Sequence, residues 1–133
     1  MKILINRGNI TNAKSYPFWS ELLILLKEHE IREINGILPE QEIKDLVNWA
    51  DRVVTIDTFL IHFIKYYKLQ TPTIVLWALS DPAIFGYPEQ INLLKHLKYL
   101  RPGQFLWWKD VVCPKEAWVS SQEVYNTIGR LMI

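Results

Sequence analysis

The sequence contains one cysteine, few glycines and almost no net charge, and each scarcity excludes a class of protein. A lone thiol, Cys113, can neither close an internal disulfide nor hold a zinc ion by itself. A formal net charge of +1 provides no basic field to gather phosphates, so no nucleic-acid partner is expected. The five glycines form neither a Gly-x-Gly-x-x-Gly loop nor a Walker A loop. The three histidines are far apart in sequence, so we expect no metal and no cofactor.

Long hydrophobic runs are also missing. The longest aliphatic run, Leu22 to Leu26, is far shorter than the ~20 residues that cross a bilayer. The start of the chain, Met1 to Arg7, lacks the apolar stretch of a signal peptide. We therefore expect a cytoplasmic protein without a membrane span. Its 133 residues match one domain, so residues 1–133 are predicted to form a single unit.

Half of the residues are hydrophobic, and their spacing alternates between strand and helix patterns. The predicted strands are 2–6, 31–35, 52–56 and 73–77, and 104–113 is predicted to be a strand or an extended segment. The predicted helices are 17–28, 39–50, 59–68, 89–99 and 120–131, the last one beginning with a Ser120-to-Glu123 capping box. This alternation predicts an α/β protein with a mostly parallel sheet and helices on both faces.

Ligands of open parallel sheets bind beyond the carboxyl ends of the strands, close to helix N-termini. The loops at 7–16, 35–38, 57–62 and 78–87 are predicted to meet there, and the third carries the most information. Directly after Asp57 the strand turns into a helix, whose first free amides suit a phosphate or diphosphate. His62 lies in the same turn and is placed to donate a further hydrogen bond. The alternative is that Asp57 is only a helix cap and His62 a partly buried polar residue.

Several segments, taken in order, resemble the donor-binding domain of glycosyltransferase family 9, the heptosyltransferase-like group of GT-B enzymes. The segments are Lys14-Ser15-Tyr16-Pro17, Ala50-Asp51, Asp57-Thr58-Phe59-Leu60-Ile61-His62, Pro72 to Trp77 with Ser80-Asp81-Pro82 and Phe85 to Pro88, and Val119 to Val124. The Asp57-to-His62 motif is the most specific of them, and together they span nearly the whole chain. The resemblance implies a single Rossmann-like three-layer α/β/α domain of four to five strands, which is one half of a GT-B fold.

The resemblance also implies a site for a nucleotide-diphospho-sugar. It assigns the diphosphate to Asp57, to the backbone amides of Thr58, Phe59 and Leu60, to the His62 side chain and to Lys14. Arg7, Gly8, Asn9, Asp81 and Tyr87 are expected at the rim. Simpler explanations stay open for several of them: Lys14 as a solvated loop lysine, Gly8 as a turn residue, and Asp81 and Tyr87 as loop structure. No catalytic residue is assigned.

The chain departs from the family pattern in three places. Phe59 stands where the family has a glycine, and its ring is expected to crowd a diphosphate. A strand and helix that carry an acidic residue toward the ribose have no secure equivalent, Glu40 included. The acceptor-binding domain, with the catalytic base, would precede Met1. Sugar transfer is therefore expected to require a separate acceptor domain, on another subunit or in a longer chain from which this domain is excised; without one, the chain is not expected to catalyse.

A second hypothesis treats the chain as a non-catalytic Rossmann-like interaction module whose phosphate site has degenerated around Phe59. Its partner surface would be the segment from Trp107 to Trp118, which would bind an acceptor-domain subunit or a second copy of the chain. Packing of these tryptophans into the core is the alternative for that segment. The residues specify neither the nucleotide base nor the sugar nor the acceptor.

Overall fold

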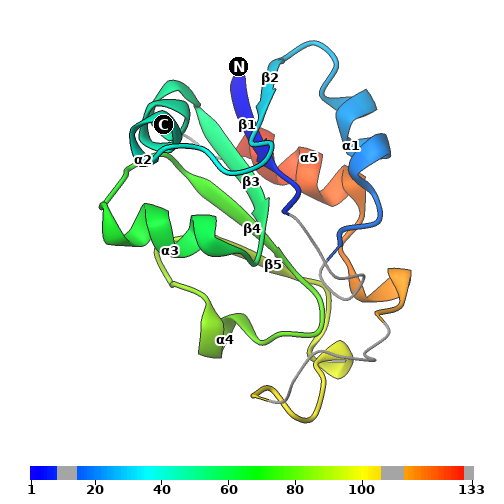
Figure 1. Ribbon diagram of the computed structural model, residues 1–133. Coiled ribbons are helices and arrows are strands. Elements are labelled where there is room, and N and C mark those ends of the chain that lie inside the picture. Colours follow the sequence, from blue (N-terminus) through cyan, green and yellow to red (C-terminus); the bar gives the residue numbers. More distant parts are fainter. Residues whose placement is uncertain (9–14, 106–112, 131–133) are drawn as a thin grey trace.

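Five parallel strands form one sheet, with helices packed on both of its faces (Figure 1). The computed structural model describes residues 1–8, 15–105 and 113–130. The strands are β1 (Lys2–Asn6), β2 (Glu30–Glu33), β3 (Arg52–Ile56), β4 (Thr73–Trp77) and β5 (Ile91–Leu94). The helices are α1 (Trp19–Leu25), α2 (Glu40–Trp49), α3 (Phe59–Tyr66), α4 (Pro82–Phe85) and α5 (Ser121–Arg130), with 3₁₀ turns η2 (Leu97–Tyr99) and η3 (Lys115–Ala117).

The spatial order of the strands is β2-β1-β3-β4-β5, and every neighbouring pair is parallel. Strand β1 pairs with β2 on one side and β3 on the other, so that Ile3 lies between Ile31 and Arg52. The chain first moves outward from β1 to β2, then returns and continues in the opposite direction. This reversal makes the β1/β3 border the topological switch point of the sheet. The predicted α/β class and single Rossmann-like domain are confirmed.

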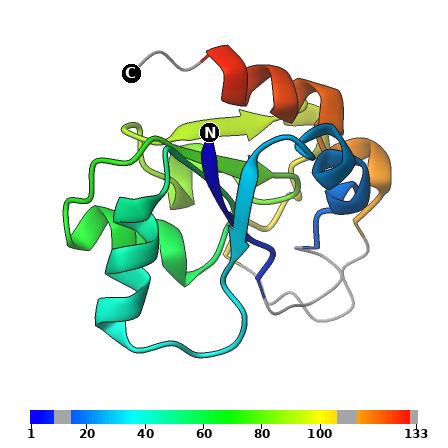
Figure 2. The same cartoon turned by 90° about the horizontal axis from the view of Figure 1, so that it is seen from above.

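Helices cover both faces of the sheet (Figure 2), and alternate residues of the strands supply hydrophobic clusters on both faces. On one face, Ile5 and Val54 pack with Leu22 of α1 and with Val124 of α5. On the other face, the core contains Leu4, Val53, Ile43 and Val47 of α2, and Leu60 and Ile64 of α3. Strands β3 and β4 are buried along their whole length, as their nearly continuous apolar sequences predict for central parallel strands.

The last helix begins where its sequence predicts. The Ser120 hydroxyl accepts a hydrogen bond from the Glu123 amide at 3.1 Å, and α5 starts at Ser121. Val124 and Ile128 lie one turn apart and are both buried. Position 131, the last residue of the predicted apolar stripe, lies outside the described residues.

The helix predicted over 89–99 is wrong. Ile91–Leu94 is instead an edge strand that pairs with β4, and a short 3₁₀ turn follows at Leu97–Tyr99. Pairing with β4 satisfies the backbone of this segment, and the Asn92 side chain accepts a hydrogen bond from the Trp77 indole at 2.9 Å. Four apolar-rich residues are too short for periodicity to separate strand from helix. Most of the segment predicted as extended, 106–112, lies outside the described residues.

Candidate functional site

The carboxyl ends of β1 and β3 border a cavity of about 320 Å³ at the switch point. We call it the switch-point cavity; it is lined by Asn6, Gly8, Ile34, Gly36, Ile37, Thr58 and Phe59. In Figure 1, α3 begins directly where β3 ends, so the helix N-terminus meets the end of β1 at this border. Gly8 has a φ of 72° and Gly36 a φ of 71°, which are left-handed conformations that glycine adopts without strain.

The Asn6 side chain connects the ends of the two strands. Its amide nitrogen donates to the hydroxyls of Thr55 at 3.1 Å and Thr58 at 2.9 Å, and its carbonyl oxygen accepts from the Gly8 amide at 3.3 Å. Asn6 is 2% exposed, and its bond to Thr55 is buried, whereas the bonds to Thr58 and Gly8 are partly buried. The network fixes the Gly8 turn against the start of α3. The sequence did not predict this network, because the network requires β1 to lie beside β3.

Helix α3 presents its N-terminal backbone to the cavity. Thr58 is the cap: its hydroxyl accepts from the Leu60 amide at 3.4 Å, a long and weak hydrogen bond, and its carbonyl accepts from the Ile61 amide at 3.3 Å. Among the described residues, the Phe59 amide has no acceptor. The first turn therefore offers one uncommitted donor and one weakly held donor at the positive end of the helix dipole.

The Phe59 ring borders the switch-point cavity and is 50% exposed. A cavity lies beside the ring, and crowding of a bound diphosphate by this ring stays a prediction. Asp57, partly buried, lies between the end of β3 and the Thr58 cap. The turn from Asp57 to Leu60 thus has the strand-to-helix geometry that its sequence predicts.

Arg7, the residue directly after β1, is held in an ion pair. Its Nε lies 2.6 Å from a Glu33 carboxylate oxygen at the end of β2. The pair is partly exposed, so its net contribution to the local potential is small. Asn9 and Lys14, the other residues expected on this loop, lie outside the described residues. The described part of the loop therefore contributes to this site the Gly8 turn and the Arg7–Glu33 pair, whose opposite charges cancel.

His62 of α3 and Tyr87 come together outside the switch-point cavity. The imidazole Nδ1 lies 2.7 Å from the Tyr87 hydroxyl, and the two rings pack edge to face. Neither residue lines the switch-point cavity. Asp81 caps α4, and its carboxylate accepts a hydrogen bond from the Ala83 amide at 2.9 Å. This contact agrees with the alternative that Asp81 has a structural role in its loop. A direct role of His62, Asp81 or Tyr87 in ligand binding stays a prediction.

A second cavity of about 480 Å³ adjoins the first along the groove between α2 and α3, and we call it the aromatic cavity. It shares Gly36, Ile37 and Phe59 with the switch-point cavity, and its other lining residues are Leu38, Glu40, Ile43, Phe63 and Tyr67. Sequence reasoning missed it, although Phe59, Phe63 and Tyr67 stand four residues apart and therefore share one helix face.

Glu40 is the charged residue among those that line the aromatic cavity. A hydrogen bond from the Tyr67 hydroxyl and the Lys44 ammonium 3.2 Å away hold the pKa of the Glu40 carboxyl below its usual range. The same hydrogen bond raises the pKa of Tyr67 to about 12. The Lys44 ammonium also lies 3.9 Å from the centre of the Tyr67 ring. At neutral pH the lining therefore carries a carboxylate acceptor and a neutral phenol, with the Lys44 ammonium paired to the carboxylate.

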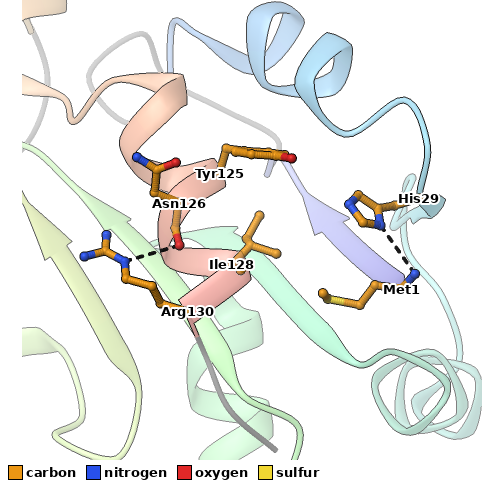
Figure 3. A pocket seen from close by; sticks show the side chains of 7 residues that line it. Met1, His29, Tyr125, Asn126, Ile128 and Arg130 are labelled. Atoms are coloured by element: carbon orange, nitrogen blue, oxygen red, sulfur yellow. Dashed lines mark hydrogen bonds between the residues drawn. The ribbon is translucent and has the colours of Figure 1, made fainter.

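A larger cavity of about 560 Å³ lies at the opposite edge of the sheet, between α5 and the amino ends of β1 and β2 (Figure 3). His29 Nδ1 is 3.3 Å from the Met1 amine, and Arg130 Nε donates to the Asn126 carbonyl at 3.3 Å. The Met1 amine, His29 and Arg130 are thus already engaged with neighbours. Ligands of parallel sheets bind at the carboxyl ends, so the switch-point cavity is the stronger candidate despite its smaller volume.

The tryptophan-rich segment is partly core. Trp118 is 3% exposed, and its ring packs edge to face on Tyr16 with centroids 5.6 Å apart. Packing into the core, the alternative for this segment, is therefore correct for Trp118. Trp107 and Trp108 lie outside the described residues. Burial raises the pKa of the Cys113 thiol, which disfavours the reactive thiolate.

Comparisons with protein-family models, with curated proteins and with solved structures give no match for this chain. Among the described residues, no helix is both long and apolar enough to span a bilayer. Within the same part of the chain, no group of three His, Cys, Asp or Glu side chains is arranged to hold a metal ion. Function therefore has to be inferred from the residues and geometry of the cavities.

Proposed function

We propose that the chain is the nucleotide-diphospho-sugar-binding lobe of a glycosyltransferase of the family 9 type. The observation that carries the proposal is the coincidence, at one topological switch point, of an open cavity, the Gly8 turn and the N-terminus of α3 with an uncommitted Phe59 amide. A diphosphate accepts hydrogen bonds from such amides and is stabilised by the helix dipole. Transfer of the sugar requires an acceptor domain with a catalytic base, which this lobe does not provide.

A proline substitution tests the amide directly. Phe59 is the first helical residue after the Thr58 cap, a position where proline is favoured because its missing N–H has no intrahelical partner. Thr58 has φ −142° and ψ −174°, an extended conformation that a following proline allows. Phe59→Pro therefore removes the donor and keeps the helix, whereas Phe59→Ala removes only the ring. The two variants form a matched pair.

The measurement is calorimetric titration of both variants with inorganic pyrophosphate. Loss of one charge-assisted hydrogen bond is expected to weaken binding to Phe59→Pro by about tenfold or more relative to Phe59→Ala. Circular dichroism of both variants checks that the helix is retained. Equal affinities, or no pyrophosphate binding by the wild-type protein at millimolar concentration, would overturn the proposal.

A second candidate function, the non-catalytic interaction module, is favoured by the exposure of apolar side chains at the same mouth. Ile37 is fully exposed and Phe59 half-exposed, and together they border both cavities. A partner protein would bury them. This candidate predicts self-association that Ile37→Lys abolishes, measured by analytical ultracentrifugation. A monomeric wild-type protein that binds pyrophosphate would favour the donor-binding lobe instead.

A further inference from the structure

The aromatic cavity has no role in holding a diphosphate, yet it opens directly beside the switch-point cavity. The two share Gly36, Ile37 and Phe59. Each has a volume, about 320 and about 480 Å³, within the range typical of small-molecule sites. A ligand with a charged part and a flat apolar part, linked by a few bonds, matches this pair of adjoining cavities.

From this geometry we infer that Phe59 is a stacking platform for the nucleobase, which occupies the aromatic cavity while the diphosphate occupies the switch-point cavity. The inference rests on the proposed function and adds the position of the base and a residue that selects for it. Phe59 lines both cavities and exposes half of its surface, so a planar ring can lie against it without displacing the core.

The remaining walls suit a nucleobase. Ile43 is buried beneath the cavity in the core between α2 and α3, and Phe63 packs against the same core. Phe63 and Tyr67 continue the aromatic stripe, with ring centroids 4.7 Å apart. The ionised Glu40 of the lining, beside its bonds to Tyr67 and Lys44, has further lone pairs that can accept from the N–H groups on nucleobase edges. The apolar walls match the two faces of a base, and the carboxylate matches its polar edge.

Phe59, which stands where the resembled family has a glycine, then has a function of its own. Phe59 lines both cavities, and in this proposal its amide binds the anion while its ring stacks on the base. Phe59 therefore contributes to binding twice, through separate groups. This separation makes the two contributions measurable one at a time.

The test compares two probes, inorganic pyrophosphate and a set of nucleoside diphosphates (ADP, UDP and GDP), on wild type, Phe59→Ala and Phe59→Tyr. Phe59→Ala is expected to weaken binding of the preferred nucleoside diphosphate by about tenfold, which is the usual effect of one lost base–aromatic stack. Its affinity for pyrophosphate stays within about twofold of wild type, because the amide donor remains. Phe59→Tyr keeps wild-type affinity for both probes.

Tyr66→Ala is the matched control, since Tyr66 is an exposed aromatic on the same helix and lines neither cavity. It should leave both affinities unchanged. An unchanged or increased nucleoside diphosphate affinity in Phe59→Ala would overturn the stacking role, and an increase would mean that the ring obstructs the site. If wild type binds neither probe, the proposed function itself fails, so the two failures are distinguishable.

Discussion

Replacing Asn6 with alanine is expected to destabilise the protein more than any single surface substitution, because its side chain ties the end of β1 to the end of β3 and to the start of α3. The change removes hydrogen bonds to the hydroxyls of Thr55 and Thr58 and leaves the Gly8 amide without its acceptor. Each such bond contributes about 0.5–1.5 kcal/mol net, so the expected loss in the free energy of unfolding is about 2–4 kcal/mol. Asn6→Asp keeps an acceptor for the Gly8 amide, so its free energy of unfolding should lie between those of wild type and Asn6→Ala.

Urea denaturation followed by circular dichroism measures this loss. The control is Asn48→Ala on the exposed face of α2, where alanine is the better helix former and the change should stay within about 0.5 kcal/mol of wild type. The m-value should be the same for all variants, since the area exposed on unfolding hardly changes. A loss below about 1 kcal/mol for Asn6→Ala would refute the view that this network fixes the switch point.

Three further predictions concern the core, the glycines and the pH dependence of stability. Leu76→Ala in the fully buried strand β4 should cost about 2–5 kcal/mol by urea denaturation. Gly86→Ala should lower Tm, because a Cβ there would lie 2.8 Å from the Pro82 carbonyl oxygen, whereas Gly129→Ala, with nothing within 4 Å, should raise it. Since the pKa of Glu40 is lowered on folding from 4.5, its stabilising effect is present above that pH and lost as pH falls through the lowered value. Glu40→Gln should therefore flatten the acid limb of the stability profile, and an unchanged limb would contradict this assignment.

The central strands were predictable because burial on both faces of a parallel sheet requires nearly continuous apolar sequence. β3 and β4 carry that pattern over five residues each, bounded by polar and proline residues. β5 was not predictable, since Ile91–Leu94 is a short edge strand with partly buried side chains. Its conformation is decided by pairing with β4, a tertiary interaction that local periodicity does not encode.

The candidate site likewise has a part that the local sequence predicted and a part that depends on tertiary contacts. The turn from Asp57 into α3 is local, so the position of the cap and of the first helical amides followed from the sequence. The Asn6 network and the pairing of His62 with Tyr87 join segments far apart in the chain, and they depend on strand order. The four-residue spacing of Phe59, Phe63 and Tyr67 was enough to predict an aromatic stripe. It was not enough to predict the cavity, because the loop from Gly36 to Leu38 also lines it.

The most direct measurement of the central claim is a backbone-amide NMR titration of the protein with nucleoside diphosphates. If the diphosphate binds at the switch point, the largest shift changes will occur at the amides of Gly8, Phe59 and Leu60, which belong to the end of β1 and the first turn of α3. Absence of shift changes at millimolar ligand, or changes confined to the cavity beside His29 and α5, would contradict the claim.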